Sequence, residues 1–180
     1  GVEILVNAKV EQVFGLSGGA IEITYGQDGV KKTVQGSHLL VATGRTPNTE
    51  GIGLELAGVE LTDRGYVKVN ERLETTAEGV WANGEVAGSP QFTHVAFDDF
   101  RILRDNFSGG NRTTTGRQLP FALFTDPELA RIGLNETEAK AKGISYRLFK
   151  IPMASVLRTR MLSETRGFMK ALVGEDDRIL

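Results

Sequence analysis

The sequence predicts an α/β portion followed by an α+β portion with an antiparallel sheet. Three features support this fold class. Short β-branched or aromatic runs with glycine turns between them fill residues 1–35, a continuous apolar run follows at residues 38–42, and a helix pattern followed by two strand patterns occupies residues 135–173. The chain has 180 residues, 40% of them apolar, which is enough to bury a core.

The composition excludes several classes of function. The net charge is −2 and no block of Lys and Arg occurs, so we expect no nucleic-acid partner. The apolar runs are far shorter than the roughly 20 residues of a membrane span, and no leader pattern occurs, so we expect a cytoplasmic protein without a membrane partner. With no cysteine and only two histidines, we expect no thiol nucleophile and no metal site.

The first elements are expected to form a three-stranded meander. Its strands are residues 9–14, 20–25 and 31–35, because Gly18-Gly19 and Asp28-Gly29 supply hairpin turns between them. The apolar run at 38–42 is predicted to be a strand of a parallel sheet, buried on both faces. Recurring glycines between residues 48 and 90 predict loops, with short strands at 66–69 and 79–82.

A helix is predicted after Pro90, because apolar residues recur there on one helical face. These are Ala96, Phe100, Leu103 and Phe107. The polar stretch 106–118 is the expected internal boundary. Beyond it we expect a strand at 119–124, a helix with Asn135 and Glu138 in a capping box and Gly143 as its stop, and strands at 146–151 and 167–173.

Two motifs carry the functional signal. Residues 42–48, Ala-Thr-Gly-Arg-Thr-Pro-Asn, follow the apolar run, and a strand that ends in Thr-Gly leaves main-chain groups free at the edge where α/β folds bind ligands. Residues 81–86, Trp-Ala-Asn-Gly-Glu-Val, combine a glycine with a carboxylate that can accept from a sugar hydroxyl, ahead of a helix start. Taken alone, an ordinary turn, a solvated Glu85 and a helix-surface His94 remain alternative interpretations.

The two motifs, in this order, resemble those of the pyridine nucleotide-disulfide oxidoreductases, which include dihydrolipoamide dehydrogenase, glutathione reductase and mercuric reductase. The dimerisation domain of that family opens with a segment similar to residues 124–134 and later contains one similar to residues 167–170. The resemblance implies three parts. Residues 1–48 would be the C-terminal part of an NAD(P)H-binding domain, 49–115 the second segment of an FAD-binding domain, and 116–180 a truncated dimerisation domain.

The resemblance also implies cofactors, partners and site residues. FAD and NAD(P)H are the cofactors of the parent enzyme, and a homodimer forms through residues after Leu119. The cofactor-binding positions pair as Thr43 with Gly44 on the flavin side, Gly84 with Glu85 at the ribityl and pyrophosphate region, and Phe92 with Thr93, whose backbone approaches the flavin pyrimidine edge. Glu85 departs from the family, which has Asp at this position.

The family's redox cysteine pair, both glycine-rich nucleotide fingerprints and the C-terminal His-Glu pair have no counterpart in the sequence. We therefore expect a piece of a larger enzyme that passes hydride from NAD(P)H through flavin to a disulfide, dihydrolipoamide-type or metal-ion acceptor. The isolated chain is expected to be inactive, with no catalytic residue and no bound cofactor. One alternative is a non-catalytic dimerising interaction module derived from the family. Another is a monooxygenase-like or thioredoxin-reductase-like flavoprotein, which gives no role to residues 124–128.

Overall fold

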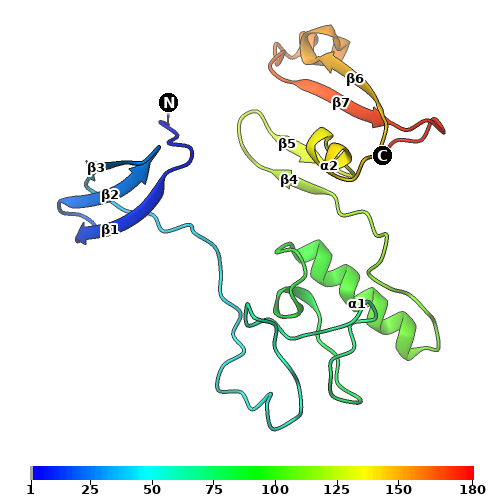
Figure 1. Cartoon of the computed structure of the whole chain (residues 1–180). Coiled ribbons are helices and arrows are strands. Elements are labelled where there is room, and N and C mark those ends of the chain that lie inside the picture. The colour runs from blue at the N-terminus through cyan, green and yellow to red at the C-terminus, as the bar shows by residue number, and fades with distance from the viewer. Residues whose placement is uncertain (1) are drawn as a thin grey trace. The chain divides into compact units, whose positions relative to one another are not determined.

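The computed structural model describes residues 2–180 and divides the chain into two compact units, Gly1–Thr46 and Pro47–Leu180 (Figure 1). The first unit holds a three-stranded antiparallel sheet in the order β1-β2-β3, formed by β1 (Lys9–Gly15), β2 (Ile21–Gln27) and β3 (Val30–Gly36). The predicted meander is confirmed. Asp28 and Gly29 both have positive φ, at 52° and 77°, as a two-residue hairpin turn requires.

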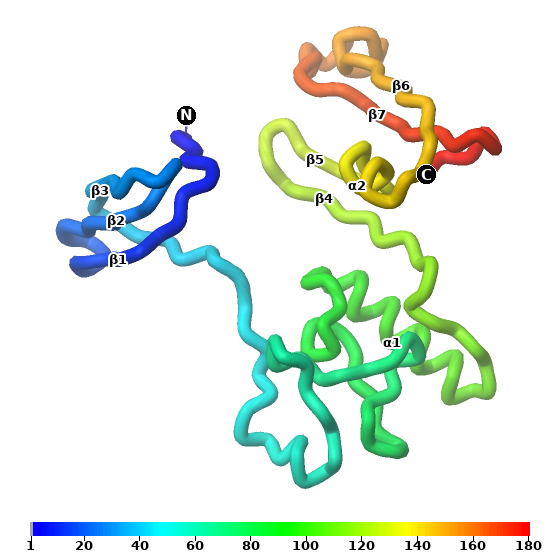
Figure 2. Tube along the Cα trace, viewed as in Figure 1, coloured from blue at the N-terminus to red at the C-terminus, as the bar shows by residue number. Residues whose placement is uncertain are grey.

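The run at residues 38–42 is not a strand, so this prediction is wrong for the described chain. Figure 2 shows the trace of the chain continuing beyond β3 as an open stretch. The segment leaves β3 as an extended connection, in which Leu40 is 87% and Val41 69% exposed. A strand of this composition is buried only where neighbouring strands pair with it and helices cover both faces. Among residues 2–180, no strand pairs with this run.

The second unit begins with loops that lead to η1 (Gly84–Ala87), a 3-10 turn, and α1 (Thr93–Phe107). The predicted helix is confirmed, but its buried face is a different one. Val95, Asp99 and Ile102 are fully buried, whereas Phe100 is 44% and Phe107 61% exposed. The face of α1 that is buried in the fold therefore contains the Asp99 carboxylate, and the aromatic face is partly exposed.

The two strands predicted between residues 48 and 90 are reduced to isolated bridges. Val69 bridges Thr75, and Glu74 bridges Trp81. Trp81 also packs edge-on against Phe107 of α1, with ring centroids 4.8 Å apart. These loops are held by isolated bridges, by further backbone hydrogen bonds such as that from the Lys68 N–H to the Glu60 carbonyl at 2.9 Å, and by the packing of Trp81 on the helix.

The remaining elements form two small antiparallel sheets. β4 (Phe121–Leu123) pairs with β5 (Leu129–Arg131), and β6 (Arg147–Pro152) pairs with β7 (Phe168–Val173). The helix α2 (Glu136–Ala141) lies between the two pairs in sequence, and η2 (Met153–Ser155) and α3 (Leu157–Met161) follow β6. The predicted fold class is confirmed, although β5, η2 and α3 were not expected.

The capping box of α2 forms as predicted. The Asn135 side chain accepts from the Glu138 backbone N–H at 2.8 Å, and the Glu138 carboxylate accepts from the Asn135 N–H at 3.0 Å. The bond from the Asn135 backbone holds the pKa of Glu138 below its usual value, and the Arg131 guanidinium adds to this effect. Below that lowered pKa the carboxylate is protonated and its half of the box weakens.

We predict that Asn135→Ala lowers the free energy of unfolding by about 1 kcal/mol, because one helix N–H loses its acceptor. Asn135→Asp keeps an acceptor and serves as the control.

The folded pKa of Glu138 is depressed, so its contribution to stability is present above the pKa of the unfolded state and is lost as the pH falls through the folded pKa. Urea unfolding at neutral and acidic pH measures both effects. An equal loss for Asn135→Asp at neutral pH would contradict this account.

Candidate functional site

The second motif folds as a tight turn that is closed at both ends and precedes α1. Gly84 is buried with φ at 70°, and an added Cβ would lie 3.2 Å from the Cβ of Ala96 in α1. The Gly88 N–H donates to the Glu85 carbonyl at 3.0 Å, and the Ser89 N–H donates to the Gly84 carbonyl at 3.3 Å. The backbone at Gly84 therefore approaches α1 in a conformation that favours glycine.

Asp99, on the buried face of α1, holds both ends of this turn. Its Oδ2 atom accepts from the Gly84 N–H at 2.7 Å and from the Ser89 hydroxyl at 2.7 Å. Its Oδ1 atom accepts from the Arg117 guanidinium at 2.5 Å. A fully buried carboxylate needs such partners, because an unpaired charge is strongly disfavoured in the interior. We refer to Gly84, Ser89, Asp99 and Arg117 as the Asp99 cluster.

The start of α1 has neither a side-chain cap nor an acidic side chain in its first turn. Phe92 occupies the N-cap position. The first N–H groups of a helix lack partners within the helix and carry partial positive charge. The Phe92 ring stacks on His94 at 5.3 Å and on Phe121 at 5.9 Å. His94 is an exposed residue on the surface of the helix.

The predicted cofactor-binding residues fall in both units. Gly84, Glu85, Phe92 and Thr93 belong to the second unit, where the turn and α1 bring them into one region. Thr43 and Gly44 belong to the first unit, in the exposed segment after β3. Gly44 has φ at 118°, and no atom would lie within 4 Å of an added Cβ. The sharp backbone turn expected at Thr43-Gly44 is present, without the buried strand that was expected to precede it.

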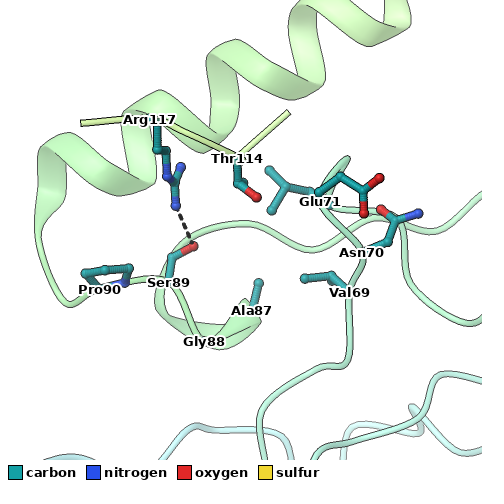
Figure 3. Close-up of a pocket in the computed structure, with 10 residues that line it drawn as sticks. Val69, Asn70, Glu71, Ala87, Gly88, Ser89, Pro90, Thr114 and Arg117 are labelled. Atoms are coloured by element: carbon teal, nitrogen blue, oxygen red, sulfur yellow. Dashed lines mark hydrogen bonds between the residues drawn. The ribbon is translucent and has the colours of Figure 1, made fainter. Parts of the chain in front are cut away.

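A shallow pocket of about 330 Å³, largely open to solvent, lies beside the turn and is lined by Val69, Asn70, Ala87, Ser89, Thr114 and Arg117 (Figure 3). Within residues 2–180, no group of three acidic or histidine side chains is arranged to hold a metal ion, and no helix is long and apolar enough to cross a membrane.

Two family models match the chain. Residues 1–99 match the pyridine nucleotide-disulphide oxidoreductase model, and residues 119–180 match the dimerisation domain of the same family. The chain belongs to the pyridine nucleotide-disulphide oxidoreductase family. Members of this family are flavoproteins that depend on FAD and NAD(P)H, and the dimerisation domain implies that they form homodimers.

Several members of this oxidoreductase family are similar to the chain over nearly its whole length. The probable pyridine nucleotide-disulfide oxidoreductase RclA of Escherichia coli is 37% identical over 96% of this chain and 38% of its own length. The dihydrolipoyl dehydrogenase of Bacillus subtilis is 34% identical over 98% of this chain and 37% of its own. The chain thus spans less than two-fifths of the length of these relatives.

Solved structures of this oxidoreductase family agree with the fold. The HOCl-induced flavoprotein disulfide reductase RclA of Escherichia coli has a TM-score of 0.81 at 35% identity, covering 99% of this chain and 40% of that one. LpdA of Mycobacterium tuberculosis has a TM-score of 0.81 at 30% identity, covering 94% of this chain and 36% of that one. The resemblance drawn from the sequence motifs is confirmed.

The sequence interpretation missed the Asp99 cluster. Asp99 lies four residues after Val95 and three before Ile102, and a charge on an otherwise apolar stripe is a signal of a buried, paired carboxylate. The aromatic stripe of α1 is the more conspicuous pattern in the sequence, and it predicts a different buried face. Arg117 lies in the polar stretch 106–118, whose composition predicts only a boundary.

We predict that Gly84→Ala lowers the free energy of unfolding by roughly 1–3 kcal/mol, because it combines a positive φ with a close approach to Ala96. Gly58 has φ at 74° and open space at its Cβ position, so Gly58→Ala measures the backbone term alone. Urea unfolding of the two variants isolates the packing contribution. Equal losses would show that contact with α1 does not constrain the turn.

Proposed function

We propose that this chain is the flavin-side and dimerisation portion of a larger enzyme that passes hydride from NADH or NADPH through FAD to a disulfide, dihydrolipoamide-type or metal-ion acceptor. The observation that supports this most is the turn at Gly84, closed at both ends and followed by the uncapped start of α1. The similarity to dihydrolipoyl dehydrogenases and to a flavoprotein disulfide reductase supports the same class of reaction.

The residues of the turn and of α1 fit a flavin dinucleotide. Gly84 lets the turn lie close against α1, and the half-buried Glu85 that follows it carries a carboxylate suited to a ribityl hydroxyl. The start of α1 at Phe92 and Thr93 offers backbone N–H groups to the pyrimidine edge. In this proposal Thr43 and Gly44 line the flavin side of the cofactor. When bound, the flavin supplies the two-electron chemistry, and these residues bind and orient it.

The proposal assigns a different role to each of three parts of the chain. Residues 1–48 would complete an NAD(P)H-binding domain, 49–115 would contribute to the FAD-binding domain, and 116–180 would pair with a second copy of the protein. The last part has large apolar side chains that are half exposed or more, as an association surface requires. They include Phe149, Leu157, Met161, Phe168 and Met169. The chain has no cysteine, so a thiol that reduces the acceptor must come from elsewhere in the enzyme.

The proposal predicts a contrast between the isolated chain and the full-length enzyme. The full-length protein should bind FAD and oxidise NADH or NADPH with lipoamide, glutathione disulfide or mercuric ion as acceptor. The isolated chain should show no turnover, because it lacks a redox thiol and both glycine-rich nucleotide fingerprints. Steady-state assays with each acceptor measure this, and turnover by the isolated chain above the buffer rate contradicts the proposal.

A non-catalytic dimerising module is the second candidate, and the match of residues 119–180 to a dimerisation domain favours it. In that case a complete reading frame would encode a folded, colourless dimer that takes up no FAD. Sedimentation velocity combined with the visible absorption spectrum separates the two candidates, since the enzyme would sediment as a yellow dimer.

Glu85 provides a second test of flavin binding, because the family has Asp at this position. The longer side chain must fold back or act through a water to reach the same ribityl hydroxyl, which weakens a charge-assisted bond. We predict that Glu85→Asp in the full-length enzyme tightens FAD binding by up to about tenfold, equivalent to ~1.4 kcal/mol, and leaves the fold unchanged. Fluorescence titration of the apoenzyme measures the affinity. Looser binding would show that the pocket is adapted to Glu85.

A further inference from the structure

We propose that Asp99 is a positioning residue for flavin binding and that Arg117 supplies the charge on which this role depends. Asp99 would not touch the cofactor. It would hold the turn from Gly84 to Ser89 in the geometry that presents Glu85 and the start of α1. This inference rests on the proposed function and extends it to two residues outside the motifs.

The geometry of the turn supports this role. One carboxylate oxygen, Oδ2, accepts from both the first and the last residue of the turn, Gly84 and Ser89, at 2.7 Å each. The turn also closes on itself through the bond from the Ser89 N–H to the Gly84 carbonyl. Glu85 is the residue directly after the anchored Gly84. A shift of the Asp99 carboxylate therefore moves Gly84, and with it Glu85, relative to the start of α1.

The charge of Asp99 is balanced from outside the turn. The Arg117 side chain is 14% exposed, against 0% for Asp99, and it also lies 3.5 Å from the Ser89 hydroxyl (Figure 3). Asp98 also faces Arg117, at 3.5 Å, but its closer partner is Arg112 at 2.6 Å. Arg117 is thus the principal counter-ion of a buried carboxylate, and its removal leaves that charge uncompensated.

Arg117 also connects the turn to another part of the chain. It lies in the segment between α1 and β4, two residues before the region that matches the dimerisation domain. The guanidinium therefore ties the start of that region to the flavin-side turn. Supporting residues of this kind set the precision with which a binding site holds its ligand.

The test is Asp99→Asn in the full-length enzyme, with Asp98→Asn as the matched control. Asparagine keeps the size of the side chain but removes the charge, and its amide N–H must face either Arg117 or the Gly84 and Ser89 donors. We expect Asp99→Asn to weaken FAD binding at least tenfold, or ~1.4 kcal/mol, and Asp98→Asn to change it less than twofold. The flavin midpoint potential and visible spectrum, measured on the FAD-saturated protein, should shift in the first variant only.

Arg117→Met and Arg112→Met form a second matched pair, since methionine keeps much of the apolar stem. Arg117→Met should weaken FAD binding, and Arg112→Met should not. In the double variant Asp99→Asn/Arg117→Met, the loss of stability should be smaller than the sum of the single losses, because no buried charge remains unpaired. Its FAD affinity should nevertheless stay low.

A purely structural role gives a different pattern. Asp99→Asn would then lower the melting temperature while the folded protein bound FAD with unchanged affinity, potential and spectrum, and this result overturns the inference. If Asp99→Asn does not fold, Ser89→Ala takes its place, because it removes one donor to Oδ2 and leaves the charge pair intact. It should weaken FAD binding several-fold, and unchanged binding overturns the inference. Wild-type enzyme without affinity for FAD would overturn the proposed function itself.

Discussion

A single buried carboxylate connects three stretches of the second unit. Asp99 belongs to α1, Gly84 and Ser89 to the turn before the helix, and Arg117 to the segment after it. A charge in the interior is tolerated only when its hydrogen bonds are complete, so the three stretches keep their geometry together or lose it together. The conformation of the turn therefore depends on Asp99 and Arg117 as well as on the glycine at position 84.

The features that the sequence predicts well are those whose causes are adjacent in the chain. Asp28 and Gly29 lie at the tip of a hairpin and have the positive φ that such a turn needs. Asn135 and Glu138 are three residues apart and satisfy each other's backbone. The run at 38–42 has the composition of a buried strand, but burial requires neighbours that the described residues do not supply. Its local pattern could not reveal that difference.

The same distinction between adjacent and distant residues applies to the candidate site. The glycine at position 84 and the helix start after Phe92 were found because they belong to contiguous motifs, and the structure gives both the local geometry that the motifs imply. Their roles toward a cofactor stay predictions. Asp99 and Arg117 are 18 residues apart and meet only because the chain folds back along α1. No local pattern marks such a pair, apart from a carboxylate on an apolar stripe.

The exposed segment after β3 affects how any measurement of assembly on the isolated chain is interpreted. Leu40 and Val41 stand largely in solvent within an extended backbone, a combination that invites intermolecular β-pairing and precipitation. The apparent mass that light scattering measures for the isolated chain would include both this adventitious clustering and any pairing through residues 116–180. Leu40→Lys together with Val41→Lys would place like charges on this segment and oppose such clustering, so an apparent mass measured on that variant reports the pairing through residues 116–180.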